Sequence, residues 1–149
     1  LVPMSGGGLM AGCASAMHQI DPGCTLIGVE PSTADDTLQS FQAGHPVRIP
    51  PPRTIADGLA VTAPGDETFA INHRLVSDVV TVTDDQLIDA MRLARDVLGR
   101  RLEPSGVAGL AALLDDLDRF RGRRVGIVLS GGNIDDARFD EVTRRRAPG

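Results

Sequence analysis

The sequence contains no lysine, because all 15 of its Lys and Arg residues are arginines. These residues therefore cannot supply a lysine that forms a Schiff base, acts as a general base or binds phosphates in a P-loop. Tryptophan and tyrosine are also absent, and there are only four phenylalanines. The scarcity of aromatic rings argues against the stacking platforms on which single-stranded nucleic acids bind.

An excess of positive charge, long apolar runs and paired cysteine motifs are missing as well. The formal net charge is −5, which argues against broad nucleic-acid binding because such binding needs a basic surface. No apolar run approaches the length needed to cross a bilayer, so we expect no membrane partner. Cys13 and Cys24 form no C-x-x-C motif. We expect both to be free thiols in a reducing compartment, the cytoplasm.

The composition that remains is that of one globular domain, with 149 residues, 42% of them hydrophobic and 23% charged. Apolar segments typical of buried strands alternate with segments of helical periodicity. This pattern predicts an α/β fold, a mostly parallel sheet with helices on both faces. Five prolines predict an irregular excursion over residues 45–65. The predicted strands are residues 1–4, 25–29, 78–82 and 124–129. The predicted helices are residues 9–20, 34–43, 66–75 and 84–98, the last of which begins with a capping box. A further helix is predicted from residue 104 and includes Leu117.

A glycine-rich turn between the first predicted strand and helix gives the strongest local signal. The range Ser5–Gly8 ends in three consecutive glycines, which let the backbone approach a ligand closely. The helix start behind it offers unpaired N–H groups and the positive end of its dipole, which favours a phosphate ligand over a plain tight turn. Gly6-x-Gly8-x-x-Ala11, with Glu30 about 20 residues later, also fits a dinucleotide-binding fingerprint, so this alternative stays open.

Two further groups of residues follow predicted strands. The range Ser130–Asn133 comes directly after residues 124–129, where ligands bind in parallel sheets. The Ser130 hydroxyl is suited to a ring nitrogen, and a helix cap with a turn is an equally good interpretation. Glu30, Asp35 and Asp36 offer carboxylate oxygens of the kind that hold Mg²⁺ or Ca²⁺. Their spacing alone favours the alternative, in which the two aspartates complement the dipole at a helix start.

Five segments of the chain form an ordered series: Val2–Leu9, Gly28–Asp36, Thr54–Leu59, Glu103–Gly106 and Leu129–Asn133. In this order they resemble the threonine dehydratase/serine racemase family of fold-type II pyridoxal-phosphate (PLP) enzymes. The resemblance covers nearly the whole chain, and five ordered motifs are far more specific than one glycine loop. It implies that residues 1–149 are the carboxyl-terminal portion of a catalytic domain, part of its large domain, with the amino-terminal half absent.

The resemblance implies a set of cofactor-binding positions. In the family, the positions matching Ser5–Leu9 hold the PLP phosphate, the one matching Ser130 bonds the pyridine nitrogen, and those matching Gly58 and Glu103 line the pocket. Ser5 stands where many members have glycine, and a serine still supplies its N–H. These residues should line one cleft. The complete set is Ser5, Gly6, Gly7, Gly8, Leu9, Gly58, Glu103 and Ser130.

The resemblance also implies a cation site. Glu30, the carbonyl of Ala34 and Asp36 match positions that bind a divalent cation in some members of the family. This agreement favours an Mg²⁺ or Ca²⁺ site beyond what the spacing of the carboxylates indicates by itself.

The activity implied is that of a PLP-dependent threonine or serine dehydratase, an ammonia-lyase that converts a hydroxyamino acid to a 2-oxo acid and ammonia, in a homo-oligomeric enzyme. The family's Schiff-base lysine is not among these residues, so we expect them to be inactive alone. Serine racemase-type activity is the close alternative. Other classes are a nucleotide-binding module that uses Gly6, Gly8 and Ala11, and a degenerate fragment that only packs or oligomerises. The nucleotide alternative leaves 56–58 and 130–133 without a role.

Overall fold

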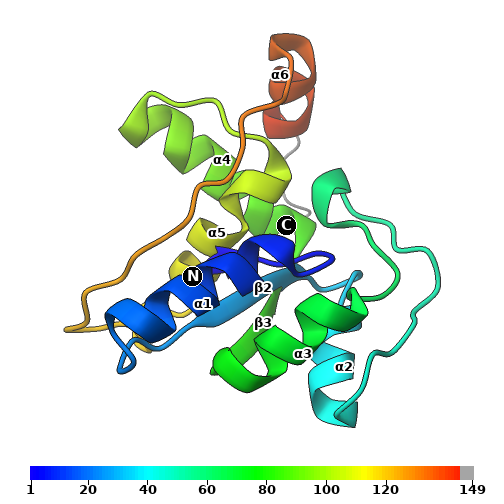
Figure 1. Cartoon of the computed structure of the whole chain (residues 1–149). Coiled ribbons are helices and arrows are strands. Elements are labelled where there is room, and N and C mark those ends of the chain that lie inside the picture. Colours follow the sequence, from blue (N-terminus) through cyan, green and yellow to red (C-terminus); the bar gives the residue numbers. More distant parts are fainter. Residues whose placement is uncertain (145–149) are drawn as a thin grey trace.

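The computed structural model describes residues 1–144 and has a parallel three-stranded sheet at its centre (Figure 1). The strand order is β1-β2-β3, with β1 at Val2–Pro3, β2 at Ile27–Pro31 and β3 at Asp78–Val82. In the register, Val29 lies opposite Pro3 on one side and Val80 on the other. Because all three strands run the same way, their carboxyl ends lie at one edge of the sheet.

Helices cover both faces of the sheet, so the predicted α/β architecture is confirmed. Ile27 and Val29 of β2 face a core formed with α4 and α5, whereas Val2 and Val79 face a second core with Met10 of α1. Figure 1 shows α1 and α3 side by side on one face, with α5 on the other. The helices are α1 (Gly8–Ile20), α2 (Asp36–Ala43), α3 (Asp66–Leu75), α4 (Asp84–Leu98), α5 (Ala108–Asp115) and α6 (Asp136–Arg144), with 3-10 turns η1 (Asp57–Leu59) and η2 (Pro104–Val107).

The local signals placed several boundaries correctly. The capping box predicted before residue 84 is present, since the side chains of Thr83 and Gln86 each accept the backbone N–H of the other residue. Residues 45–65 are irregular as predicted, apart from the short turn η1. In the part of the chain that the structure describes, no helix is long and apolar enough to cross a membrane.

The strand predicted over residues 124–129 is wrong. This segment is extended but forms no regular strand. It lies beside Leu1, whose amino group donates to Gly126 O at 2.8 Å and whose carbonyl accepts from Val128 N at 3.0 Å. Leu1 directly precedes β1, and among residues 1–144 no backbone hydrogen bond joins this segment to β1 itself.

The helix predicted from residue 104 through Leu117 is also shorter than expected. It begins as the 3-10 turn η2, continues as α5 and ends at Asp115. The Asp116 carboxylate accepts the N–H of Arg119 at 3.0 Å, a local bond that competes with continuation of a helix. Leu117 is consequently exposed.

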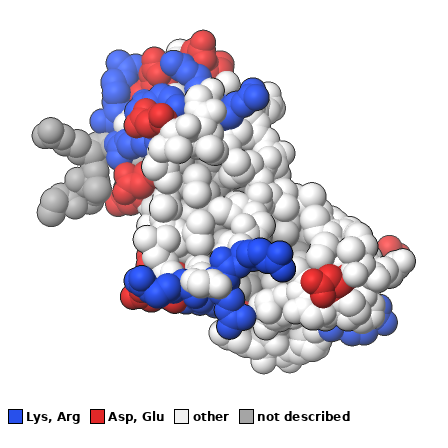
Figure 2. Space-filling model, turned by 90° about the vertical axis from the view of Figure 1, so that its left-hand side faces the viewer, with Lys and Arg blue, Asp and Glu red and all other residues white. Residues whose placement is uncertain are grey.

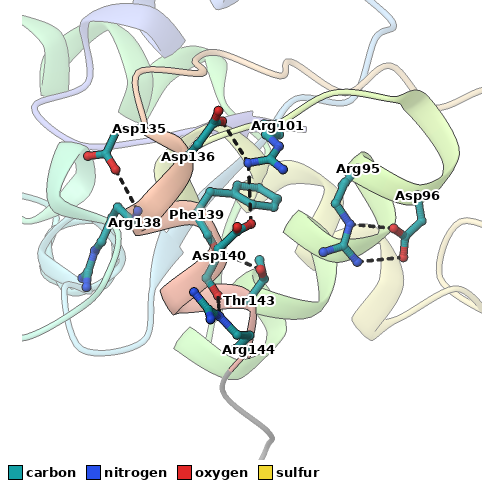
Figure 3. Close-up of polar contacts among 10 residues, drawn as sticks. All are labelled: Arg95, Asp96, Arg101, Asp135, Asp136, Arg138, Phe139, Asp140, Thr143 and Arg144. Atoms are coloured by element: carbon teal, nitrogen blue, oxygen red, sulfur yellow. Dashed lines mark hydrogen bonds and ion pairs between the residues drawn. The ribbon is translucent and has the colours of Figure 1, made fainter.

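Helix α6 has no counterpart among the predicted elements. Asp135 accepts the N–H of Arg138, which stabilises the start of the helix, and Phe139 is fully buried against the α4 side of the core. The Arg101 guanidinium lies 5.1 Å from the centre of the Phe139 ring and pairs with Asp136 at 2.9 Å (Figure 3). Long-range contacts of this kind hold α6. Its apolar residues Phe139 and Val142 are three apart, a helical spacing from which no helix was predicted.

Several arginines among residues 1–144 form ion pairs with aspartate or glutamate side chains, as between Arg119 and Asp78 at 2.7 Å. On the face drawn in Figure 2, charged residues of both signs gather at the upper and lower ends, with a broad uncharged area between them. This face therefore has no patch of a single charge.

Candidate functional site

A cavity of about 310 Å³ lies at the carboxyl end of β1, a size at the lower end of small-molecule sites. Its walls come from the glycine loop before α1, from η1, from the start of η2 and from the segment after residue 129. All eight positions that the resemblance assigned to a cofactor are in its lining. The complete lining is Pro3, Ser5, Gly6, Gly7, Gly8, Leu9, Gly58, Leu59, Glu103, Ser105 and Ser130.

The glycine loop presents backbone to the cavity. Gly7 has a φ of 90°, in the left-handed region that favours glycine. Helix α1 begins at Gly8 with no side-chain cap, so its first N–H groups are left for another acceptor. A Cβ at Gly6 or Gly8 would meet no atom within 4 Å, so there is open space beside both. This cradle fits a phosphate, which the unpaired N–H groups and the helix dipole both favour.

Two side chains of α3 hold the glycine loop in place, and the sequence analysis missed both. Asn72 is 1% exposed and its Nδ2 donates to Gly7 O at 3.0 Å. Thr68 Oγ1 donates to Gly6 O, which also accepts from Gly65 N at 3.2 Å. Thr68 and Asn72 are four residues apart, so they lie on one face of the helix. Nothing local in the sequence reveals that this face meets a loop more than sixty residues away.

The opposite wall is made of two segments in close contact. Glu103 N donates to Gly131 O at 3.3 Å, and Ser130 N donates to Gly106 O at 3.4 Å. A Cβ at Gly106 would overlap the backbone of Gly131, and one at Gly131 would overlap the Glu103 carboxylate. Both glycines are therefore required for this approach, which brings Glu103 and Ser130 to the same cavity.

The charge in the cavity is low. Among the described residues that line it, only Glu103 has an ionisable side chain. An anionic group bound there would consequently depend on backbone N–H groups and the dipole of α1 rather than on an arginine.

The predicted cation site lies at the start of α2. Glu30 is 1% exposed, and its carboxylate accepts the N–H groups of Thr37 and Leu38 at 3.1 and 3.0 Å. Asp36 is fully buried, and neither of its carboxylate oxygens has a hydrogen-bond partner among residues 1–144. Burial raises the pKa of Glu30 to about 8 and that of Asp36 to about 6, because it disfavours the charged forms.

These observations bear on both interpretations of the acidic group. Asp35 and Asp36 lie at the N-cap and in the first turn of α2, where the helix-dipole interpretation places them. The carboxylate that accepts N–H groups at this helix start is that of Glu30. The unpartnered oxygens of Asp36 fit a cation ligand. Within the described part of the chain, no group of three or more His, Cys, Asp or Glu side chains is placed to hold a metal ion. A cation here would thus need the Ala34 carbonyl and water besides the two carboxylates.

The geometry disfavours the dinucleotide alternative. In such a site an acidic residue after the second strand bonds a ribose hydroxyl. The carboxylate of Glu30 is instead buried against α2, and Glu30 does not line the cavity.

Comparison with known proteins decides the family. Residues 1–131 match the family described as "Pyridoxal-phosphate dependent enzyme". The chain belongs to this family. The predicted membership is therefore confirmed, and PLP is the cofactor that the family implies. The cradle at the start of α1 fits the phosphate of this cofactor. Helix α6 begins beyond the matched residues.

Relatives of the chain within the PLP family include ammonia-lyases and racemases. The chain is 42% identical over 143 residues to L-threo-3-hydroxyaspartate ammonia-lyase of Pseudomonas sp, covering 96% of this chain and 45% of that protein. It is 44% identical over 140 residues to serine racemase of Arabidopsis thaliana, covering 91% and 42%. Among solved structures, maize serine racemase superimposes with a TM-score of 0.86 at 40% identity, covering 94% of this chain and 45% of that one. The chain thus spans less than half the length of these relatives.

Proposed function

We propose that the full-length protein containing these residues is a PLP-dependent ammonia-lyase that converts a β-hydroxyamino acid to a 2-oxo acid and ammonia. The observation that carries the proposal is the cavity at the end of β1, which gathers all eight positions matched to cofactor binding. Relatives that are 41–42% identical act, by their names, as hydroxyaspartate ammonia-lyase and phenylserine dehydratase. These names favour a substrate with a hydroxyl on the β-carbon.

The residues of this chain bind and orient the cofactor in the proposed site. The N–H groups of Ser5–Leu9 and the positive end of α1 bind the phosphate, while Gly58 and Glu103 form the walls beside the ring. The Ser130 hydroxyl bonds the pyridine nitrogen. When bound, PLP supplies the electron sink for the pair released at the substrate's α-carbon.

The identity of Ser130 bears on the type of reaction. A neutral hydroxyl stabilises positive charge on the ring nitrogen less than a carboxylate would, and this makes the ring a weaker electron sink. A weaker sink would suit β-elimination, because the electron pair freed at the α-carbon forms a double bond to the β-carbon as the hydroxyl group takes up a proton and leaves as water.

The covalent anchor of the cofactor must come from residues outside this chain, because the chain has no lysine. We propose that these residues form the carboxyl-terminal portion of the catalytic domain, supported by the order of the five matched segments. The 149 residues alone are then expected to release no ammonia.

The compartment and the partners of the whole protein are proposed on the resemblance and on composition. Cys13 and Cys24 are both free in the structure, which supports a reducing compartment, the cytoplasm. The homo-oligomeric state, and the absence of nucleic-acid and membrane partners, stay predictions.

The test of the activity supplies the full-length protein with PLP and L-threonine, L-serine or L-threo-3-hydroxyaspartate. We expect ammonia and the matching 2-oxo acid to form in equal amounts. Ser130→Ala should slow turnover and change the absorbance of bound PLP, and an unchanged rate and spectrum would remove the role assigned to Ser130. Formation of the D-amino acid without ammonia would establish the racemase alternative, and no reaction with a β-hydroxyamino acid would contradict the proposal.

We also propose that Glu30, Ala34 and Asp36 hold Mg²⁺ or Ca²⁺, supported by the unpartnered oxygens of Asp36. A cation there would stabilise the junction between β2 and α2, because it would supply the partner that the Asp36 oxygens lack and would favour the charged forms of Glu30 and Asp36. Addition of Ca²⁺ or Mg²⁺ after treatment with a chelator should raise the unfolding temperature of the full-length protein, and Asp36→Asn should abolish this rise. An equal rise in wild type and Asp36→Asn would refute the site.

A further inference from the structure

One polar side chain in the cavity has no partner. Ser105 lines the cavity from the first turn of η2 and is only 6% exposed. Its Oγ is buried, and no group in residues 1–144 hydrogen-bonds to it. A hydroxyl that leaves water without gaining a new partner is unfavourable, and native proteins rarely bury one. Because Ser105 lines the cavity, a ligand bound there is the candidate partner of this hydroxyl.

The position of Ser105 indicates which part of a ligand it meets. A Cβ at Gly58 would lie 3.0 Å from Ser105 Oγ, so the hydroxyl is beside Gly58. The next residue, Gly106, accepts the N–H of Ser130 at 3.4 Å. Ser105 therefore lies on the wall that Gly58, Glu103 and Ser130 form, and not on the glycine loop that faces a phosphate.

We propose that the Ser105 hydroxyl donates a hydrogen bond to a polar atom of the cofactor ring, as a second contact beside that of Ser130. This inference rests on the proposed function, since it takes the cavity to hold PLP. Ser105 belongs to the segment Glu103–Gly106, in which the family resemblance assigns a role only to Glu103. The unpartnered hydroxyl of the structure assigns one to Ser105.

Two ligands separate a ring contact from a phosphate contact. Pyridoxine 5′-phosphate has the ring and the phosphate but no aldehyde, so it binds without a covalent bond to any lysine. Inorganic phosphate occupies only the glycine loop. In the full-length protein freed of PLP, Ser105→Ala should raise the Kd of pyridoxine 5′-phosphate about three- to tenfold, the size of one neutral hydrogen bond. The Kd of inorganic phosphate should not change.

The stability of the cofactor-free protein gives an independent readout. Removing an unpartnered hydroxyl removes an unfavourable group, so Ser105→Ala should leave the unfolding temperature unchanged or raise it. Ser40→Ala is the matched control, because Ser40 is also buried but its Oγ donates to Asp36 O at 2.6 Å and accepts from Val47 N at 2.8 Å. This control should lower the unfolding temperature and leave the Kd of pyridoxine 5′-phosphate unchanged. Ser105→Thr, which keeps a hydroxyl, should retain most of the affinity.

Each outcome decides the inference. If Ser105→Ala lowers the unfolding temperature and leaves both Kd values unchanged, Ser105 is structural and the inference is wrong. An equal loss of affinity for both ligands would mean that the substitution distorts the whole cavity, and this also overturns it. If wild type and Ser105→Ala bind pyridoxine 5′-phosphate equally well, the inference is contradicted but the proposed function is not. If wild type binds neither pyridoxine 5′-phosphate nor PLP, both fall together.

Discussion

The cavity and helix α6 are built from different kinds of contact. Around the cavity the contacts involve the backbone. The Asn72 side chain donates a hydrogen bond to Gly7 O, and the backbones of Gly106 and Gly131 lie close together. Helix α6 is instead attached to the fold by side chains, since Phe139 is buried in the core and Arg92 donates to Thr143 O at 2.7 and 2.9 Å. The first region lies within residues matched by the family, and α6 lies beyond them.

The two regions should therefore tolerate different substitutions. A cavity wall in which two backbone segments lie in close contact is disrupted when an atom is added between them, because neither segment can move away without displacing the residues packed behind it. A helix docked by side chains fails when atoms are removed, because a cavity is left. Cofactor binding should accordingly depend on the first region, and stability alone on the second. Four substitutions test this contrast, from the largest effect to the smallest.

Phe139→Ala should have the largest effect and should act on stability alone. Phe139 is fully buried between α6 and α4, and truncating such a ring lowers the free energy of unfolding by about 3–5 kcal/mol. Chemical denaturation of the full-length protein measures this loss. Phe139→Leu is the control and should lose less than half as much. A drop in PLP affinity measured well below the denaturation midpoint would break the contrast between the two regions.

Gly7→Ala should lower both cofactor affinity and stability. The φ of 90° at Gly7 costs an alanine about 1–2 kcal/mol, and its Cβ would lie 2.7 Å from Asn72 Nδ2. We expect the Kd of PLP to rise at least about tenfold if that strain is relieved by moving the loop. Gly12→Ala in the same helix is the control, because its Cβ meets nothing within 4 Å and alanine favours the helix. Equal PLP binding by both variants would contradict the role of the loop.

Asn72→Ala should have a smaller effect on the same loop. It removes the hydrogen bond to Gly7 O, with a loss of about 0.5–1.5 kcal/mol in the free energy of unfolding, and it frees the loop to move. The Kd of PLP, followed by absorbance titration, should rise as well. Arg74→Ala, at an exposed position on the same helix, should change neither quantity. Loss of stability with unchanged PLP affinity would show that Asn72 does not position the loop.

Arg101→Gln should have the smallest effect. Arg101 is 43% exposed in its side chain and pairs with Asp136 and Asp140 at 2.9 and 3.5 Å. Exposed ion pairs and cation–π contacts each contribute about 1 kcal/mol or less. Thermal unfolding at low and high salt should show a difference from wild type that salt diminishes. A loss as large as that of Phe139→Ala would mean that charge, rather than the buried ring, docks α6.

The sequence was sufficient where a signal is local. The glycine run before α1, the capping box at Thr83 and the alternation of strands and helices each follow from neighbouring residues, and the structure has all three. The five ordered segments identified the family and the residues that line the cavity.

The sequence was insufficient where a contact joins distant segments. That Asn72 holds the glycine loop, and that Phe139 docks α6, depends on packing across the fold rather than on spacing. Residues 124–129 have the composition of a strand, but only Leu1 pairs with them. The unpartnered hydroxyl of Ser105 is visible only once the walls around it are in place.

A crystal structure of the full-length protein with PLP tests the central claim, that the cavity at the end of β1 holds this cofactor. We expect the phosphate within hydrogen-bond distance of the N–H groups of Ser5–Leu9 and the ring nitrogen facing Ser130 Oγ. A cofactor bound elsewhere, or one whose phosphate lies away from this loop, would contradict it.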